Sequence, residues 1–343
     1  MDKLTGMDEE ASGPVGMAEI AALAGVAVST VSRALSGAAG VSAPRRAKIL
    51  DIARSTGYLA PSGGTRRRPH DNPRIAVILP ESDRWVFGSI LAGLHDILTD
   101  EDAHLTVLQG LSSSQRVRML RSADLPRRFD GVVLVPMPRA TTGRRLAALP
   151  VPVVVAGTAV DGIASVGVDD LAVGQKAVNY LINTGRRRIA YAAYADHDGT
   201  PGIASQNRAR GFELSMERAG LDPTWQLKVP FGPDSGRLAA ERLLEGDHFP
   251  DAVFVTSDEM AASMMTVLRR AGVKIPDDIA VIGVDDHPIA DMVGLTTLAQ
   301  PVREQGRVGA TLALHAIHGN AQPNAIVLPT RLIVRESTSR DVS

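Results

Sequence analysis

Apolar residues near the start of the chain recur at the spacing of short helices. Residues 17–24 (MAEIAALA) and 26–36 (VAVSTVSRALS) predict two helices with Gly25 between them, and so short a turn leaves the helices packed at a steep angle. A third helix is predicted over residues 43–56, because its apolar residues return to one side and Gly57 supplies a C-terminal stop. The pattern therefore predicts a small unit of three helices.

Farther along, the pattern changes to short, continuous apolar runs separated by amphipathic helices. The runs are RIAVILP (74–80), LTVLQG (105–110), DGVVLVP (130–136), VPVVVAG (151–157), RRIAYAAY (187–194), AVFVTSD (252–258) and DIAVIGVDD (278–286). Continuous rather than alternating apolar strands between helices indicate parallel sheets that are covered on both faces. Because there are too many such units for one ordinary sheet, we expect an α/β body with more than one sheet.

A stretch with almost no apolar residues separates the two patterns. Residues 61–73 (PSGGTRRRPHDNP) have the Gly, Pro and Arg composition of a linker. We therefore predict a helix-turn-helix head over residues 14–60, a linker over 61–73 and a body over 74–343. This division agrees with the length of 343 residues, which predicts two or three folding units.

Charge is divided unevenly between these parts. The whole chain has 37 basic and 38 acidic residues, which argues against a protein that coats nucleic acid along its entire length. Residues 15–70, in contrast, contain eight basic and two acidic residues, a net charge of +6, and the remainder is acidic. Such a split predicts a nucleic-acid-binding module joined to a part with another role.

Some kinds of chemistry and location are disfavoured by what the sequence lacks. The chain has no cysteine, so it can form neither a disulfide nor a thiolate metal site. Its eight histidines lack the spacing of metal ligands, and there is no glycine-rich phosphate loop, so we predict no metal and no cofactor. No signal peptide and no run of about 18 apolar residues is present, so a cytoplasmic protein that does not bind membranes is expected.

The first two predicted helices carry the residues that a helix-turn-helix needs. Ala21 is the small residue, Gly25 the turn glycine and Val31 the apolar wedge between the helices. The outward-facing residues of the second helix are Val28, Ser29, Ser32 and Arg33. Such a face can lie in the major groove of DNA, with short side chains near base edges and hydroxyls near phosphates. Helix pairs with a glycine turn also occur in protein-interaction modules, so spacing alone leaves both interpretations open.

Acidic and polar residues gather where the predicted strands of the body end. They are Glu81, Ser257, Asp258, Asp285 and Asp286. In open α/β sheets, ligands bind in the crevice outside the carboxyl ends of the strands. The body is therefore predicted to bind a ligand at this edge.

The head and the body together closely resemble the LacI (lactose repressor) family of bacterial regulators. In the head, the resemblance lies in VAVSTVSRAL followed by VSAPRRAKILDIARSTGY. In the body it lies in VGVDDLAVGQKAVNYLINTGRRRIAY (166–191), NRARGFELSMERAGL (207–221), VFVTSDEMAA (253–262), GVKIPDDIAVIGVDD (272–286), LTTLAQP (295–301) and LPTRLIVREST (328–338). These stretches cover most of the chain in the order of the family, so the resemblance is specific.

The resemblance implies a fold: an N-terminal all-α helix-turn-helix head and an α/β periplasmic-binding-protein-like body of two doubly wound subdomains. The segments that cross between the subdomains are expected near residues 157–165, 288–296 and 320–330. The N-subdomain would then comprise about 74–160 and 297–320, and the C-subdomain about 165–290 and 325–340.

The resemblance also implies partners. It predicts a homodimer that binds a pseudo-palindromic operator in DNA. Because the chain ends soon after the last matching stretch, without room for a further coiled coil, we expect a dimer rather than a tetramer.

Matched position by position, the resemblance gives the second helix of the head specific roles. Val28 and Ser29 would read bases. Thr30 and Ser32 would contact phosphates, and Arg33 would contact either a base or a phosphate.

The linker departs from the family's hinge, which usually forms a short helix whose leucine enters the minor groove. Gly63 and Gly64 disfavour a helix here, and Arg67 stands where the leucine is usual. We expect Arg66, Arg67 and Arg68 either to enter the groove or contact phosphates through their charge, or to form a flexible, solvated basic linker.

In the body, the resemblance implies effector contacts by two charged residues and by aromatic rings. Arg208 can donate two hydrogen bonds to vicinal hydroxyls or a carboxylate, and Asp285 can accept hydrogen bonds from hydroxyls or an amine. Phe231 falls where the family has an aromatic wall. Trp85 and Phe87 lie in the loop after the first body strand, where they contact either the ligand or the protein itself.

Other polar positions have alternative interpretations. Ser257 and Asp258 match cleft residues of the family, but Asp258 can also cap the helix that follows. Asp169 and Asp170 begin a helix, where carboxylates offset the dipole and accept from free amides. We interpret this second pair as structural.

These features predict a sequence-specific DNA-binding transcription regulator, by default a repressor, controlled by a small, polar, sugar-like effector between two subdomains. The effector would favour a closed body and change the spacing of the two heads, and either sign of coupling is allowed. The alternative is a cytoplasmic solute-binding or sensor protein of the periplasmic-binding-protein class without a DNA role. An enzyme is a third class, which fold alone does not exclude, but the sequence has no nucleophile elbow, metal cluster or paired-carboxylate motif.

Overall fold

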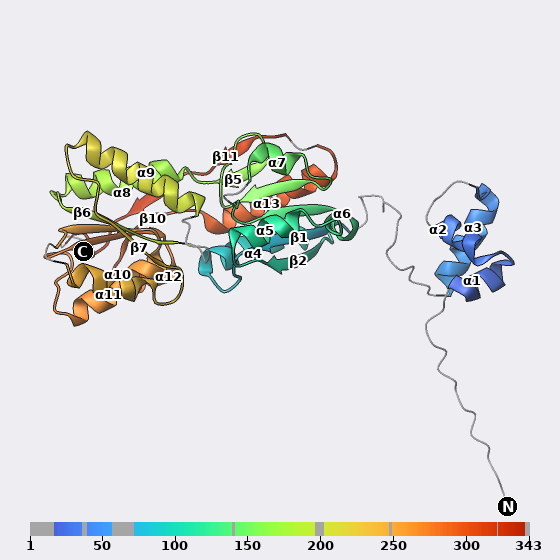
Figure 1. Cartoon of the computed structure of the whole chain (residues 1–343), viewed down its shortest axis with the longest axis horizontal. Helices are drawn as coiled ribbons and strands as arrows, with labels where there is room; N and C mark the ends of the chain where they lie inside the picture. Colours follow the sequence, from blue (N-terminus) through green and yellow to red (C-terminus); the bar gives the residue numbers. More distant parts are fainter. Residues whose placement is uncertain are drawn as a thin grey trace, which may run out of the picture. The chain divides into compact units, whose positions relative to one another are not determined.

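The computed structural model describes residues 17–35, 40–56, 72–138, 141–195, 202–246, 249–320 and 322–339. The chain forms two compact units, Met1–Arg68 and Pro69–Ser343, both drawn in Figure 1. The helix stop at Gly57 and the predicted hinge residues Gly63, Gly64, Arg66, Arg67 and Arg68 lie outside the described residues.

The first unit contains the three predicted helices. Helices α1 (Met17–Ala24) and α2 (Val28–Leu35) are bent by 102° relative to each other. Gly25 in the turn has a φ of +69°, a conformation that glycine adopts without strain. Helix α3 (Ala43–Ser55) packs against both. The core of this head consists of Ile20, Ala21, Ala24, Val31, Ala34, Ile49 and Ala53. The head therefore has the steep helix pair that the sequence predicts.

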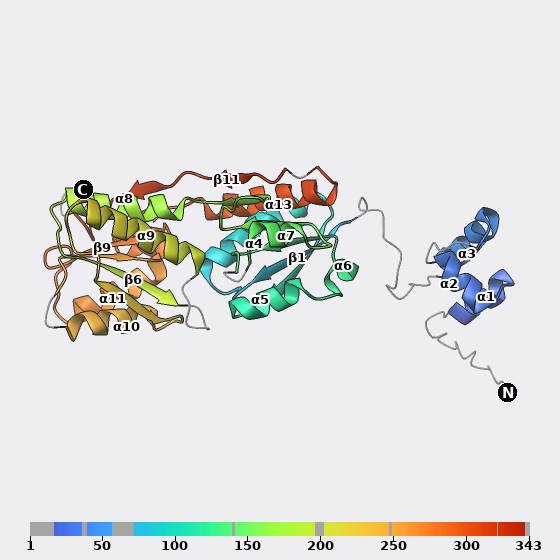
Figure 2. The same ribbon diagram turned by 45° about the horizontal axis from the view of Figure 1, so that its top comes forward.

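The second unit contains two six-stranded sheets, and the first has the order β11-β5-β4-β3-β1-β2 with all neighbours parallel. Its strands are β1 (Arg74–Leu79), β2 (His104–Gln109), β3 (Gly131–Leu134), β4 (Val153–Ala156), β5 (Ser165–Gly167) and β11 (Ala325–Val327). One face is covered by α4 (Trp85–Leu98) and α13 (Val302–Ile317). The other is covered by α5 (Ser113–Leu120), α6 (Leu125–Arg128) and α7 (Gly143–Ala147) (Figure 2).

The second sheet has the order β12-β10-β9-β8-β6-β7, and only β12 runs antiparallel to its neighbour. Its strands are β6 (Ile189–Ala195), β7 (Gln226–Pro230), β8 (Ala252–Val255), β9 (Ala280–Asp285), β10 (Thr296–Ala299) and β12 (Arg331–Ile333). One face is covered by α8 (Asp170–Asn183) and α9 (Ile203–Arg218). The other is covered by α10 (Ser235–Leu244), α11 (Asp258–Arg270) and α12 (Pro288–Met292). The predicted fold class, a helical head and an α/β body of two subdomains, is confirmed.

The chain crosses between the two sheets three times, and two crossings lie later in the sequence than predicted. Strand β5 still pairs with β4 and β11 in the first sheet, so the first crossing comes after residue 167 rather than within 157–165. Strand β10 pairs with β9 in the second sheet, so the second crossing lies at residues 300–301 rather than within 288–296. The third joins β11 to β12 across residues 328–330. We call residues 72–167 and 302–327 the N-subdomain and residues 170–299 and 331–338 the C-subdomain.

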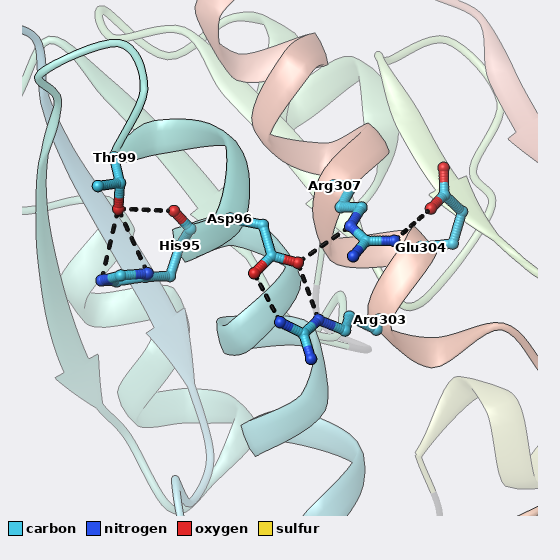
Figure 3. A network of polar contacts seen from close by, with 6 residues as sticks. All are labelled: His95, Asp96, Thr99, Arg303, Glu304 and Arg307. Carbon is cyan, nitrogen blue, oxygen red and sulfur yellow. Dashed lines mark hydrogen bonds and ion pairs between the residues drawn. The ribbon is translucent and has the colours of Figure 1, made fainter.

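Helices α4 and α13 of the N-subdomain approach each other closely. A Cβ atom at Gly93 would overlap the carbonyl oxygen of Arg303, and one at Gly306 would overlap the carbonyl oxygen of Ile90. Glycine at both positions therefore lets the two backbones touch. Next to this contact, the Asp96 carboxylate accepts hydrogen bonds from Arg303 at 2.7 and 2.8 Å and from Arg307 at 3.0 Å (Figure 3). The two helices are thus joined by main-chain contact and by an ion-pair network.

Within the described part of the chain, no single helix is both long and apolar enough to cross a membrane. Only when α1 and α2 are taken together are they long and apolar enough to span a membrane, judged by length and composition alone. Their bend of 102° and their apolar packing against α3 account for them as parts of the head.

Candidate functional site

One face of α2 is held in the core of the head, and the opposite face is open. Val31 and Ala34 are buried against α1 and α3. The outward residues Val28, Ser29, Ser32 and Arg33 are exposed, and Thr30 is half-buried. The Arg33 side chain donates a hydrogen bond from Nε to the carbonyl oxygen of Ser29, one helical turn earlier, at 3.2 Å. Four of the five predicted DNA contacts of this helix are therefore exposed on the open face, and Thr30 lies at its border with the core.

A cleft lies between the N-subdomain and the C-subdomain. The cavity inside it has a volume of about 110 Å³. Its N-subdomain wall comes from segments that follow β1 to β4 and includes Phe87, Leu111, Arg116, Met137 and Gly157. Its C-subdomain wall includes Tyr194, Arg208, Phe231, Ser257 and Asp285. The cleft thus occupies the carboxyl edges of the parallel strands in both sheets, where the strand-end residues predicted a ligand.

Arg208 is the buried cation of the C-subdomain wall. Its Nε donates to the Asp170 carboxylate at 2.9 Å, and Nη1 donates to the carbonyl oxygen of Thr256 at 2.6 Å. Burial on its own lowers the pKa of Arg208, but the carboxylates of Asp170 and Asp285 outweigh burial and raise it above its ordinary value. Arg208 is therefore charged and fixed, with donor capacity left for a ligand.

Asp170 thus has a role that the sequence interpretation of the Asp169–Asp170 pair missed. The carboxylate of Asp169 accepts from the main-chain N–H of Ala172 and caps α8, as expected. Asp170 is 4 % exposed and turns inward to Arg208. The pairing of Asp170 with Arg208 was hard to predict from the sequence because the two residues are 38 positions apart.

Asp285 ends β9 and faces the cleft with a φ of +122°, a conformation that few residues other than glycine, Asn and Asp adopt. Its carboxylate accepts a hydrogen bond from Gln300 Nε2 at 2.6 Å, and Gln300 in turn accepts one from Gln305 at 3.0 Å. Burial raises the pKa of Asp285 to about 6, although Arg208, Gln300 and Arg84 act in the opposite direction. The carboxylate is held for an incoming donor by two amide side chains that the sequence analysis did not select.

The predicted aromatic residues separate into two groups. Phe87 and Phe231 line the cleft. Tyr194, which the sequence analysis did not select, lines it as well and meets Phe231 edge to face with ring centroids 4.9 Å apart. Trp85 instead lines a separate hollow beside the crossing segments and packs at a tilt against the ring of His287, with centroids 4.9 Å apart. The sequence showed that Trp85 follows β1 but not toward which side of α4 it points.

Ser257 and Asp258 also differ from each other in the structure. Ser257 lines the cleft and caps α11 through a hydrogen bond from the main-chain N–H of Met260. Asp258 is fully buried beneath the cleft floor, where it accepts from Thr297 at 2.7 Å and from the main-chain N–H of His287 at 2.9 Å. It does not line the cleft, and we correct its assignment as an effector contact to that of an internal tie between β10 and α12.

No group of three or more His, Asp or Glu side chains within the described ranges is arranged to hold a metal ion. The polar groups of the cleft are two guanidinium groups, one carboxylate, amides and hydroxyls, together with three aromatic rings. Such a set suits hydrogen bonding to, and stacking on, a small polar molecule.

Comparison with known proteins agrees with this division into head and body. Residues 16–61 match the family "Bacterial regulatory proteins, lacI family", and residues 178–338 match the "Periplasmic binding protein-like domain". The HTH-type transcriptional regulator CelR of Thermobifida fusca is 30 % identical over 333 residues, covering 93 % of this chain and 96 % of CelR. The HTH-type transcriptional repressor CytR of Escherichia coli K12 is 28 % identical over 331 residues, covering 94 % and 96 %.

A solved structure titled "transcriptional regulator CelR-cellobiose complex" extends the likeness to three dimensions. It is 28 % identical, covers 94 % of this chain and 99 % of that one, and superposes with a TM-score of 0.67. The likeness therefore spans head and body together, which the alternative of a solute-binding protein without a DNA-binding head does not account for. The chain belongs to the LacI family of bacterial regulatory proteins and is a helix-turn-helix DNA-binding transcriptional regulator.

Proposed function

We propose that this regulator acts as a homodimeric repressor on a pseudo-palindromic operator, and that a sugar or related polar metabolite bound in the cleft changes its affinity for DNA. The observation that carries the proposal is the cleft itself, where side chains from both subdomains converge at the carboxyl edges of two sheets. Repression is supported by the relative CytR, whose name describes a transcriptional repressor.

The outward face of α2 supports the DNA contacts. In a helix-turn-helix, side chains near the start of the second helix reach base edges in the major groove. Val28 and Ser29 occupy that position and are exposed, so we propose them as base readers. Thr30 and Ser32 are proposed to contact phosphates, and Arg33 a base or a phosphate. We retain Arg66 and Arg67 as proposed contacts on sequence grounds alone.

The composition of the cleft supports a sugar-like effector. Sugars present hydroxyls that suit charged partners such as Arg208 and Asp285, and apolar ring faces that suit aromatic side chains such as Phe87 and Phe231. The CelR structure is titled as a complex with cellobiose, so a related protein of similar fold has been solved together with a sugar.

We propose coupling by a shift of population between open and closed bodies. A ligand that bonds to both walls of the cleft favours the closed arrangement, and DNA affinity then follows the different head spacing of the two states. The sign of the effect depends on which arrangement fits the operator, so induction and corepression are both compatible with this cleft.

We further propose that the protein binds its ligand without converting it, and that it works in the cytoplasm, where the DNA is. Support for both points comes from relatives whose names describe transcriptional regulators.

The recognition helix is tested by DNA binding of the purified full-length chain. After selection of a preferred site from genomic fragments, Ser29→Ala and Arg33→Ala should each weaken binding by about tenfold, because one good base contact contributes roughly 1–3 kcal/mol. Ser29→Ala should also change the preferred bases. Arg218→Ala, which removes an exposed arginine at the end of α9 in the other unit, is the matched control and should bind like wild type. A wild-type protein that prefers no site over bulk fragments would contradict the DNA-binding role.

The effector site is tested by thermal shift in the presence of sugars, polyols and nucleosides, with cellobiose included. A ligand of the cleft should raise the melting temperature, because it binds only the folded state. Asp285→Asn and Phe231→Ala should weaken that ligand at least tenfold, since the first loses a charge-assisted hydrogen bond and the second a stacking surface. Trp225→Phe, an aromatic change in the C-subdomain outside the cleft, should respond like wild type. A ligand that stabilises both cleft variants as strongly as wild type binds elsewhere.

A further inference from the structure

Arg84 belongs to the N-subdomain, but its side chain ends on the C-subdomain. It is the N-cap residue of α4, in the loop that follows β1. Its Nε donates to the carboxylate of Glu259 on α11 at 2.8 Å, and Nη2 donates to the hydroxyl of Tyr194 on β6 at 3.3 Å. A single guanidinium group of the N-subdomain therefore contacts two elements of the C-subdomain, α11 and β6.

The same guanidinium also lies against the aromatic wall of the cleft. Its carbon atom Cζ is 4.7 Å from the ring centroid of Phe231 and 5.1 Å from that of Tyr194. A cation at this distance from a ring face is attracted by the ring's quadrupole, and the attraction grows as water is removed. Arg84 thus holds in place, from across the cleft, two of the rings that line it.

Partial burial strengthens this contact relative to an ordinary surface ion pair. The side chains of Arg84 and Glu259 are 16 % and 32 % exposed. Burial on its own lowers the pKa of Arg84, but Tyr194 and Glu259 more than compensate and raise it, so the guanidinium is charged at every physiological pH. A charged group that is paired, stacked and mostly shielded from solvent is not easily screened by salt.

The next residue makes a second contact between the same two subdomains. The ring of Trp85 packs, tilted by 55°, against the ring of His287, which precedes α12 of the C-subdomain, with centroids 4.9 Å apart. The dipeptide Arg84–Trp85 therefore contacts the C-subdomain at Glu259, Tyr194, Phe231 and His287. These contacts exist only when the two subdomains are close together.

We propose that Arg84 is a clasp that favours the closed cleft before an effector binds, through Glu259, Tyr194 and Phe231. The proposal rests on the proposed function insofar as the cleft is the effector site. By raising the fraction of closed molecules before binding, the clasp lowers the free energy that the ligand must supply to close the cleft. It therefore raises the apparent affinity by the factor by which it raises the closed population. Arg84 is a positioning residue in this account, because it acts on the rings and on the spacing of the walls.

The absence of cysteine allows a direct measurement of closure. Two cysteines can be introduced at Arg118 on α5 and Glu245 after α10, which are exposed residues on opposite sides of the cleft in the two subdomains, and labelled with nitroxides without background. The distance distribution between the labels, measured by pulsed electron resonance on the full-length chain without DNA or effector, reports open and closed populations.

In wild type without effector we expect a short and a long distance, both populated, because a body that was already fully closed would leave no population for an effector to shift. Arg84→Gln should raise the ratio of open to closed molecules by about tenfold, the size of a desolvated cation–π contact plus an ion pair. Glu259→Gln should shift the distribution the same way but less, and the double variant should add little to Arg84→Gln because both changes break one interaction. Arg237→Gln is the matched control, since Arg237 pairs with Glu241 at 2.7 Å within one subdomain, and it should leave the distribution unchanged.

Distance distributions that are identical in wild type, Arg84→Gln and Glu259→Gln would overturn the clasp. If Arg84→Gln does not fold, the distance distribution of Glu259→Gln alone tests the clasp, because that variant keeps Arg84 and the rings of Tyr194 and Phe231. The measurement uses neither DNA nor ligand, so its failure would leave the proposed function untouched. Conversely, a shifted distribution together with no ligand response in any thermal screen would support the clasp while contradicting the effector site.

Discussion

Replacing Asp170 with alanine will lower the free energy of unfolding of the body by about 3–5 kcal/mol, the usual cost of leaving one charge of a buried ion pair without its partner. Arg208 and Asp170 have side-chain exposures of 9 % and 3 %, so water cannot take the place of the lost carboxylate. Unfolding of the full-length protein by urea, followed by circular dichroism, measures the loss as a lower midpoint at constant slope.

Asp169→Ala is the matched control for this experiment. The same side chain is removed one residue earlier, but Asp169 is exposed and only caps α8, so the expected loss is about 1 kcal/mol. Equal losses in the two variants would contradict the assignment of Asp170 as the partner that fixes Arg208. A ligand found by thermal shift should also bind Asp170→Asn more weakly, because Arg208 would no longer be oriented toward the cleft.

Replacing Asp285 with asparagine will stabilise the protein without effector at pH 8, by up to about 3 kcal/mol. Burial raises the pKa of Asp285 from 3.8 to about 6, so the folded state favours the protonated carboxyl more than the unfolded state does. The stability that this group contributes is therefore fully present below about pH 4 and is lost as the pH rises through 6. Asparagine resembles the protonated form, can still accept the hydrogen bond from Gln300, and tolerates the positive φ.

The dependence of this gain on pH separates titration from other effects. Melting temperatures of wild type and Asp285→Asn should coincide near pH 4 and diverge between pH 5 and 8, with the variant higher. A difference that stays constant over this range would show that a hydrogen bond or the backbone, and not the ionisation of Asp285, causes it. In that case, ionisation of the buried Asp285 carboxyl would not lower the free energy of unfolding of wild type.

Much of this fold could be predicted from the sequence because its central strands are buried on both faces. β1, β3, β4, β8 and β9 appear in the sequence as uninterrupted apolar runs. The head could be predicted because Gly25 and the apolar spacing of α1 and α2 permit few arrangements. The edge strands β7 and β12 were harder to predict, because they are partly exposed and their residues show no continuous apolar pattern.

Residues of the candidate site were predicted where they stand at a strand end or match a cleft position of the LacI family, as Arg208 on α9 does. Asp285, Ser257 and Phe231 follow strand ends and reach the cleft as expected. Partners that come from distant segments could not be found in this way. Asp170 meets Arg208 across 38 residues, and Arg84 meets Glu259 across 175, so no local pattern relates the members of either pair.

The contact between Gly93 and Gly306 has a mechanical consequence for signalling. Because main-chain atoms of α4 and α13 touch there, side-chain rotamer changes cannot absorb a displacement, and the two helices must move as one rigid body. α13 begins at the second crossing, and its residue Gln305 is bonded through Gln300 to Asp285. A ligand that pulls on this carboxylate would therefore shift both helices along the face of the first sheet, in the manner of a shear movement. Gly93 and Gly306, which have no side chain beyond hydrogen, therefore make the N-subdomain respond stiffly to a ligand in the cleft.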